Sequence, residues 1–418
     1  MTMPVRNLPL VQWDCHGCGD CCRTYAVRVN DEEKARIEAQ DWSDVPELDG
    51  VDRTVWEKRI GDYRLNHRAD GACVFLGPDN RCRMHAKFGP ASKPAACRIY
   101  PFTFAPAGDS WRVGLRLACP AALENKGRTL SEHSSTLNEY AALLEKDKPA
   151  AGQLPVPPLQ RGSSVEWPDL FRFVTAFKKL LGKPNVPIER KLREAILLGS
   201  MCRKATFDNV SGAKLDEFLD VLSAVVSDET PDDPGKVKAP GWTARTVFRQ
   251  VAALYTRKDH GPDRGVLSDH GYLGRLVAGV RFAVGKGRVP RLHGGIPVSA
   301  TFANAETPGR GLSAKSEELL TRFYTLKVES LQFFGPPNFH LPFWDGFDTL
   351  VLTFPAIVWL SRLFAVNRDA DEAVALAVRT VDDNFGFNPL LGSRKQLWAL
   401  SMLAARGDLP RLVAWYGR

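Results

Sequence analysis

Four cysteines lie within eight residues near the start of the chain, in the segment Cys15-His-Gly-Cys-Gly-Asp-Cys-Cys22. The glycines between them allow the backbone to curl, so that the thiols can converge on one point. Such a segment adds little to the packing of a core, whereas thiolates are preferred ligands of soft metal ions and iron–sulfur clusters. The segment therefore predicts a metal centre around which the first part of the chain folds.

The remaining cysteines extend this cluster. Eight of the nine cysteines lie before residue 120, and only Cys202 lies beyond it. Thiols that merely fill a core would be spread along the chain, so Cys202 is expected to be a buried helix thiol without a special role. A thiol-rich core or disulfides are the alternatives. We expect no secretory signal in residues 1–13, which favours the reducing cytoplasm over disulfides. The predicted metal ligands are Cys15, Cys18, Cys21, Cys22, Cys73, Cys82, Cys97 and Cys119.

The spacing leaves the kind of metal open. Cys-x2-Cys-x2-Cys with a distant Cys119-Pro120 is similar to the ligand run of a bacterial-type ferredoxin, which binds a 4Fe–4S cluster, whereas zinc would take four ligands. Eight thiols could fill two sites, one cluster with further thiols beside it, or a larger site. One partition gives Cys15, Cys18, Cys21 and Cys119 to one site and Cys22, Cys73, Cys82 and Cys97 to another. His16, His67 and His85 could each replace a thiolate.

Charge and hydropathy exclude some classes of partner. The net charge is +8, but Lys and Arg are scattered along the sequence, so we expect a solvated surface and no nucleic-acid partner. The most apolar stretch, residues 347–364, contains Pro355 and Arg362 and is shorter than the roughly 20 apolar residues of a membrane span. It predicts a buried helix, and we expect no membrane association. The sequence does not set the oligomeric state.

Local patterns predict short elements in the first part of the chain. A strand is expected over residues 27–29 and a helix over 54–63. Asn30 and Glu33 have the spacing of a capping box, which predicts a helix that ends near residue 40.

Further hairpins are expected to deliver the distant thiols. Cys73 and Cys82 should lie close together on two short strands around a Gly-Pro-Asp-Asn turn. Two prolines should hold residues 93–101 extended around Cys97. A second hairpin over residues 102–117 then brings Cys119 to its end.

Composition divides the chain in two. A segment rich in Pro and Gly, residues 148–164, predicts a linker between a cysteine-cluster metal-binding domain, residues 1–147, and a mainly helical domain, residues 165–418, with a further division expected near 229–241. Residues 260–310 predict loops or short elements. The expected fold is an α+β first domain with short hairpins, followed by a mainly α-helical region. Helices are expected near residues 131–146, 167–181, 192–197, 215–225, 243–255, 313–331, 354–364, 371–381, 394–405 and 409–415.

Other candidate sites are weaker. Residues 279–287 superficially suggest a phosphate loop, but they have one residue too many before Gly-Lys and lack the final Ser or Thr. There is no Gly-x-Gly-x-x-Gly fingerprint after a strand, and the cysteine spacing is not that of radical S-adenosylmethionine enzymes. Acidic residues near aromatic ones could receive a lysine or a methylated amine, with ordinary helix faces as the alternative. They are Glu329, Asp345, Asp348, Asp382 and Asp383, beside Phe333, Phe334, Phe343 and Trp344.

The cysteine motifs, taken in order, resemble the cysteine-cluster family described as zinc- or iron-chelating. The matching pieces are Cys15-x2-Cys-x2-Cys-Cys22, Cys73-Val-Phe-Leu, Cys82 and Pro94-Ala-Ala-Cys97-Arg-Ile-Tyr-Pro101. Leu117-Ala-Cys119-Pro-Ala-Ala-Leu123 is similar to the Leu-Ser-Cys-Pro segment of the flagellin lysine-N-methylases. That branch implies transfer of methyl groups from S-adenosylmethionine to protein lysines, with an iron–sulfur cluster present.

Three hypotheses follow. The first is a cytoplasmic protein that binds an iron–sulfur cluster or zinc through its eight N-terminal cysteines. The second is a protein-lysine N-methyltransferase of the flagellin-methylase type, with a protein substrate. The third is a metal-stapled module that presents the helical half to a partner protein, in which folding and metal binding are one event.

Overall fold

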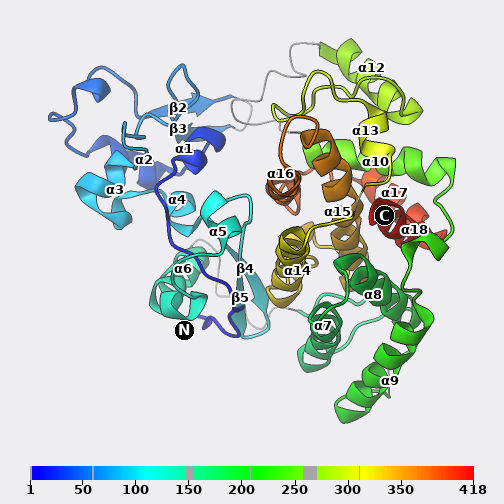
Figure 1. Ribbon diagram of the computed structural model, residues 1–418. Coiled ribbons are helices and arrows are strands. Elements are labelled where there is room, and N and C mark those ends of the chain that lie inside the picture. The colour runs from blue at the N-terminus through cyan, green and yellow to red at the C-terminus, as the bar shows by residue number, and fades with distance from the viewer. Residues whose placement is uncertain (1, 59–60, 147–154, 208, 258–270, 310) are drawn as a thin grey trace.

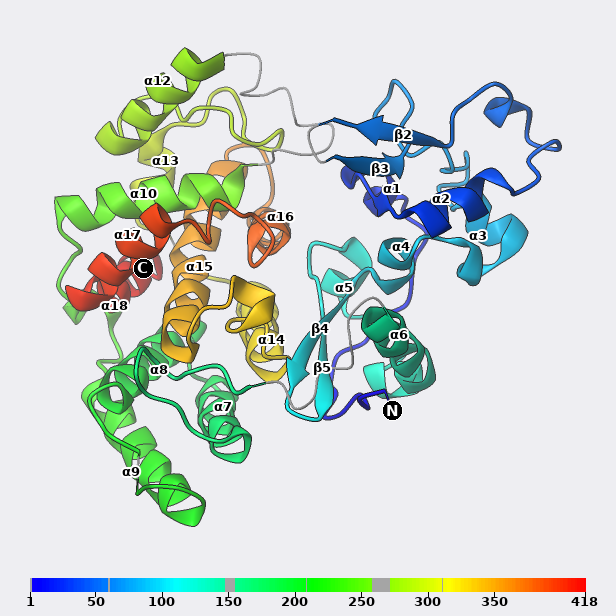
Figure 2. The ribbon, with the colours of Figure 1, turned by 180° about the vertical axis from the view of Figure 1, so that it is seen from behind.

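The computed structural model describes residues 2–58, 61–146, 155–207, 209–257, 271–309 and 311–418. A cysteine-rich N-terminal region with short antiparallel strands is followed by a mostly helical region, which confirms the predicted fold class. Figures 1 and 2 show the two regions side by side, with strands β4 and β5 facing helix α14.

The N-terminal region contains two small sheets surrounded by short helices. One sheet has the strand order β1-β3-β2, and the other is the hairpin β4-β5. The elements are α1 (Asp20–Thr24), β1 (Arg28–Val29), α2 (Asp31–Glu38), η1 (Pro46–Leu48), β2 (Thr54–Glu57), β3 (Asp62–Leu65), α3 (Arg83–Phe88), η2 (Pro90–Ser92), α4 (Ala95–Ile99), β4 (Phe102–Ala107), β5 (Ser110–Leu115), α5 (Pro120–Glu124), η3 (Leu130–His133) and α6 (Ser134–Lys146).

Two local predictions are confirmed. The Asn30 side chain accepts a hydrogen bond from the Glu33 backbone N–H at 2.8 Å, and the Glu33 carboxylate accepts one from the Asn30 N–H at 3.2 Å, which is the capping box of α2. In the second hairpin Phe102 pairs with Leu115, and the chain then leads directly to Cys119.

Three local predictions are wrong. Residues 54–57 and 62–65 form the paired strands β2 and β3 instead of a helix, because Thr54, Val55 and Trp56 favour a strand and Gly61, at φ +65°, can adopt a turn conformation. Cys73 and Cys82 lie in single bridges, to His67 and Leu76, and not on strands.

The third wrong prediction is that residues 93–101 are extended around Cys97. This segment contains the short helix α4, because Pro94 lies directly before the helix, where no intrahelical N–H is needed.

The C-terminal region is built around α15, a helix whose side chains are buried along almost its whole length. Pro355 lies inside α15 without ending it. The prediction of loops or short elements over 260–310 is wrong for residues 271–284, which form a longer helix, whereas the helix over residues 302–306 is a short element. Residues 258–270 and 310 lie outside the described residues. The elements are α7 (Trp167–Leu181), α8 (Ile188–Cys202), α9 (Ala213–Glu229), η4 (Pro234–Lys236), α10 (Trp242–Thr256), α12 (Gly271–Val284), α13 (Phe302–Glu306), α14 (Ala314–Glu329), η6 (Pro336–Asn338), α15 (Phe343–Phe364), α16 (Ala370–Asn384), α17 (Arg394–Ala405) and α18 (Asp408–Tyr416).

Helix α15 is long and apolar enough to cross a membrane, and it is the one such helix among the described residues. However, 94% of its most apolar window is buried inside the protein, as in the core helix of a soluble protein. The prediction of a buried helix over residues 347–364 is therefore confirmed.

Two separate apolar cores hold the molecule together. The large core joins the β4–β5 hairpin to the helical region, and it includes Val113, Leu115 and Cys119 together with residues of α14, α15 and α16. The small core contains nine buried side chains around the other thiols. They are Val29, Ile37, Trp42, Leu48, Leu65, Cys73, Val74, Phe75 and Met84. The predicted linker overlaps residues 147–154, which are outside the described residues, and residues 155–166 carry no helix.

Candidate metal centre

The small core contains Cys73, and the predicted ligands Cys22, Cys82 and Cys97 pack against it, with Cys21 next to Cys22 in the chain. Cys21 lies on α1, Cys73 follows β3, Cys82 precedes the first residue of α3 and Cys97 lies on α4. A hydrogen bond from the Cys73 N–H to the Cys22 carbonyl, at 2.8 Å, ties α1 to the turn that carries Cys73. Short elements from four parts of the sequence thus bring these thiols to one place.

Burial and neighbouring groups shift the pKa values of three of these thiols. Burial raises the pKa of Cys73 to about 12, the Phe75 N–H opposes this, and negative charge on Cys97, Cys82 or Cys21 would raise the pKa further. Burial likewise raises the pKa of Cys97 to about 12, with Cys82 and Cys21 acting in the same direction. A hydrogen bond with Cys22, together with burial, raises the pKa of Cys21. Without a cation, buried thiols this close together stay protonated.

A second pair of thiols lies on the side of the helical region. Cys119 is buried directly before α5, and Cys18 is exposed. Burial raises the pKa of Cys119, whereas the N–H of Ala122, in the first turn of α5, lowers it. The charge of Cys18 contributes a further rise, which places Cys18 near Cys119.

This arrangement differs from the partition weighed on sequence alone in the place of Cys21. The charge of Cys21 acts on the pKa values of Cys73 and Cys97, whereas Cys18 is the thiol that acts on Cys119. Cys15 is exposed.

All nine cysteines are free thiols. Within the described ranges, no three His, Cys, Asp or Glu side chains converge closely enough to hold a metal ion as they stand. The cluster is therefore a set of neighbouring soft donors, and small shifts of its short elements would be needed to complete a coordination shell.

The three histidines have other contacts. The His67 ring lies 3.0 Å from an Arg64 nitrogen and 3.2 Å from the Tyr25 carbonyl. His16 lies 3.6 Å from a Glu124 carboxylate oxygen. Burial and the positive charge of Lys93 lower the pKa of His85.

The acidic residues considered as amine sites are mostly paired within the chain. Asp382 pairs with Lys327 at 2.5 Å, Asp383 with Arg116 at 2.8 Å and Asp348 with Arg203 at 2.6 Å, and Glu329 pairs with Lys178. In the described part of the chain, Asp345 has no such ion pair. It lies in the first turn of α15, where the negative charge of a carboxylate interacts favourably with the helix dipole. Ordinary structural roles account for this set.

Asp348 and Asp345 line a pocket of about 570 Å³ between α8, α15 and α17. Burial raises the pKa of Asp348 to about 6. Cys202, on α8, is a buried helix thiol, as predicted, and burial raises its pKa to about 12.

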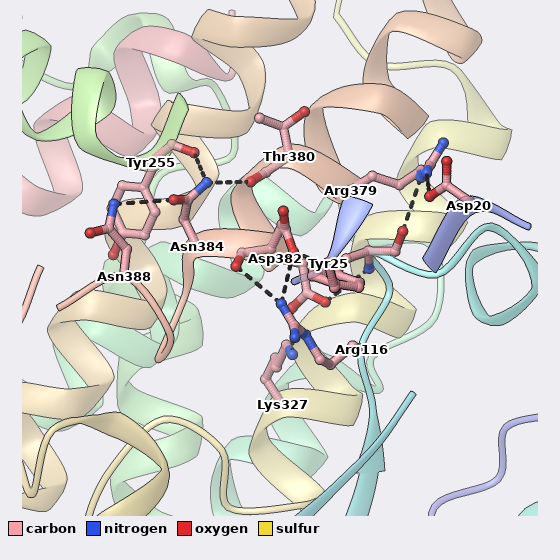
Figure 3. A network of polar contacts seen from close by, with 12 residues as sticks. Asp20, Tyr25, Arg116, Tyr255, Lys327, Arg379, Thr380, Asp382, Asn384 and Asn388 are labelled. Atoms are coloured by element: carbon pink, nitrogen blue, oxygen red, sulfur yellow. Dashed lines mark hydrogen bonds and ion pairs between the residues drawn. The ribbon is translucent and has the colours of Figure 1, made fainter. Parts of the chain in front are cut away.

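Sequence reasoning missed the polar network that joins the thiols to α16. Arg379 donates to the Asp20 carboxylate at 2.7 Å (Figure 3). Arg379 also donates to the Ala118 carbonyl at 3.1 Å, and Asp382 accepts from the Ala118 N–H at 3.1 Å. Asp20 and Arg379 are 359 positions apart, so no spacing in the sequence signals this contact.

The Cys119 segment has a third contact with α16. Arg116 donates to the Asp383 carboxylate, and the Tyr25 hydroxyl donates to the same oxygen at 2.6 Å. The Arg116 guanidinium also lies 3.8 Å from the centre of the Phe387 ring. The chain is therefore fixed to α16 at Arg116, between the end of β5 and Cys119.

Comparison with known families agrees with the cysteine pattern. The family model CxxCxxCC, described as a putative zinc- or iron-chelating domain, matches residues 14–126. No curated protein and no solved structure matches the chain. The matched segment contains all eight clustered cysteines and ends before the helical region. Residues 14–126 are thus similar to a metal-chelating domain, and the helical region lies outside that similarity.

Proposed function

We propose that this protein binds a metal centre through two sets of thiols. The first is a four-thiol site made of Cys21, Cys73, Cys82 and Cys97. The observation that carries it is the packing of Cys82 and Cys97 against the small core that contains Cys73. The charge of Cys21 acts on the pKa values of both Cys73 and Cys97, which adds Cys21 to the set. Four cysteines with no other protein ligand fit a structural zinc site or an iron–sulfur cluster.

The second set contains Cys119 and Cys18, with Cys15 as a further donor. Cys22 packs against the small core, beside the four-thiol site. Exposure of Cys15 and Cys18 leaves this set open to solvent, whereas Cys119 is anchored before α5. A cation or cluster would supply the positive charge that turns these thiols into thiolates, and binding would release their protons.

Metal analysis tests the proposal. The protein would be purified without oxygen, and zinc, iron and acid-labile sulfide would be measured together with the absorbance spectrum. Cys97→Ser should lower the metal content, because it removes one donor of the four-thiol site. Cys202→Ser is the matched control, since Cys202 is a buried thiol outside the cluster. A wild-type protein without near-stoichiometric zinc or iron, or equal metal content in both variants, would refute the proposal.

The methyltransferase hypothesis rests on the resemblance of residues 117–123 to a segment of the flagellin lysine-N-methylases. The protein substrate and the cytoplasmic location are predictions as well. Calorimetry with S-adenosylmethionine on the metal-loaded protein tests this activity. Absence of cofactor binding would argue against it and would leave the metal-binding proposal intact.

A further inference from the structure

The residue directly before Cys119 is held on both sides by α16. The Ala118 N–H donates to Asp382, and the Ala118 carbonyl accepts from Arg379. The two peptide units on either side of the Ala118 Cα are each held by one of these side chains, so the direction in which the chain enters Cys119 is set by Asp382 and Arg379.

The second contact of Arg379 reaches the other thiol-bearing segment. Its guanidinium donates to the carboxylate of Asp20, the first residue of α1, at 2.7 Å. Asp20 lies between Cys18 and Cys21 in the sequence. One arginine of the helical region thus binds both segments that carry Cys18 and Cys119, as Figure 3 shows for Arg379 and Asp20.

The helical region holds Asp382 firmly. Lys327 lies 2.5 Å from the Asp382 carboxylate and also donates to the Gln332 side-chain oxygen at 2.7 Å. The Gln332 amide in turn donates to the Ser330 hydroxyl at 2.7 Å. All these side chains are buried, so the network behaves as a rigid support and not as a surface contact.

We propose that Arg379 and Asp382 are positioning residues for the metal centre, and that Arg379 sets the geometry between Cys18 and Cys119. The inference rests on the proposed function of the cysteine cluster. Groups that orient metal ligands from outside the coordination shell are worth roughly 10- to 100-fold in metal affinity. The helical region would then be a functional part of the metal site, and metal binding would also stabilise the contact between the two regions.

Cobalt is a suitable probe because its absorbance reports thiolate ligands and their geometry. The full-length protein would be titrated with Co²⁺ without oxygen, followed by competition with Zn²⁺. Arg379→Gln should weaken metal binding at one site by roughly 10- to 100-fold and should change the spectrum of that site. The four-thiol site should change less, because Cys21 is the only one of its thiols that lies next to Asp20 in the sequence.

Arg203→Gln is the matched control. Arg203 is 26% exposed and donates to one carboxylate and one carbonyl, and Arg379 is 28% exposed with the same kinds of partner. The control should lose a comparable amount of stability and keep the wild-type metal affinity and spectrum.

Asp20→Asn tests the same link from the other side, should Arg379→Gln fail to fold. If the two residues act through each other, the double variant should cost no more affinity than the larger single change. Wild-type affinity and spectrum in Arg379→Gln or in Asp20→Asn, or fully additive losses in the double variant, would overturn the inference. A wild-type protein that binds neither Co²⁺ nor Zn²⁺ would instead overturn the proposed function, and the inference with it.

Discussion

Lys327 and Asp382 form an ion pair in which both side chains are withdrawn from water, with exposures of 1% and 0%. The pair lies where α14 and α16 meet, next to the peptide that precedes Cys119. Burial lowers the pKa of Lys327, and the charge of Asp382 opposes this shift. Since each ion is desolvated, each depends on the other for its charge to be tolerated.

Removal of one partner should therefore be costly. Lys327→Met leaves the Asp382 carboxylate buried without a counter-ion, and we expect a loss of roughly 3–5 kcal/mol in the free energy of unfolding. Denaturation in urea, followed by circular dichroism, measures this. The double variant Lys327→Met/Asp382→Leu should lose less than Lys327→Met alone, because no uncompensated charge remains. A single variant within about 1 kcal/mol of wild type would contradict this account.

The carboxyl group of Asp348 predicts a pH dependence. Burial raises its pKa from 3.8 to about 6, while Arg203 opposes the shift. The folded state therefore holds this proton more tightly than the unfolded state. Its contribution to stability is fully present below pH 4 and is lost as the pH rises through 6. A shift of about two units corresponds to roughly 3 kcal/mol at most.

Asp348→Asn removes this titration. The difference in unfolding free energy, variant minus wild type, should rise by up to roughly 3 kcal/mol between pH 4 and pH 7. Loss of the charge opposite Arg203 also changes the stability of the variant at every pH. The quantity to compare is therefore the change of unfolding free energy with pH in each protein. Parallel curves for the two proteins over this range would show that Asp348 does not titrate as proposed.

The part of the site that depends on local sequence could be predicted. The spacing of Cys15 to Cys22, the capping box at Asn30 and the β4–β5 hairpin follow from neighbours in the chain, and the structure confirms the last two. The strand segment from Thr54 was mistaken for a helix because it is too short for its period to be decisive.

What could not be predicted depends on distant contacts. The grouping of Cys21 with Cys97 is set by the packing of short elements that have no periodic signal. Likewise, the acidic residues Asp382 and Asp383 give no indication in the sequence that Lys327 and Arg116 will pair with them. A buried ion pair and an open amine site have the same local pattern, and tertiary packing alone distinguishes them.

Metal removal should affect the two regions unequally. The small core has nine buried side chains, which is little apolar surface for a cluster of short elements, so the metal is expected to supply much of its stability. After chelation, hydrogen–deuterium exchange should accelerate in residues 20–100 and change little in α15. If the exchange rates of residues 20–100 are the same before and after chelation, the small core is stable without metal.

The contact between the β4–β5 hairpin and the helical region depends on Gly114. A side-chain carbon at this position would collide with the side chains of Gln332 and Ser330, which are buried and belong to the support of Asp382. Gly114→Ala should therefore cost roughly 1–3 kcal/mol, as overpacking of a core does, and should disturb the Cys119 segment. Gly279→Ala, in α12, is the control, because nothing lies within 4 Å of its added carbon. That change should leave stability unaltered or raise it by up to about 1 kcal/mol, since alanine favours a helix. Thermal unfolding of both variants in one buffer compares them. Equal stability of the two would mean that the hairpin can move away from α14 at little cost.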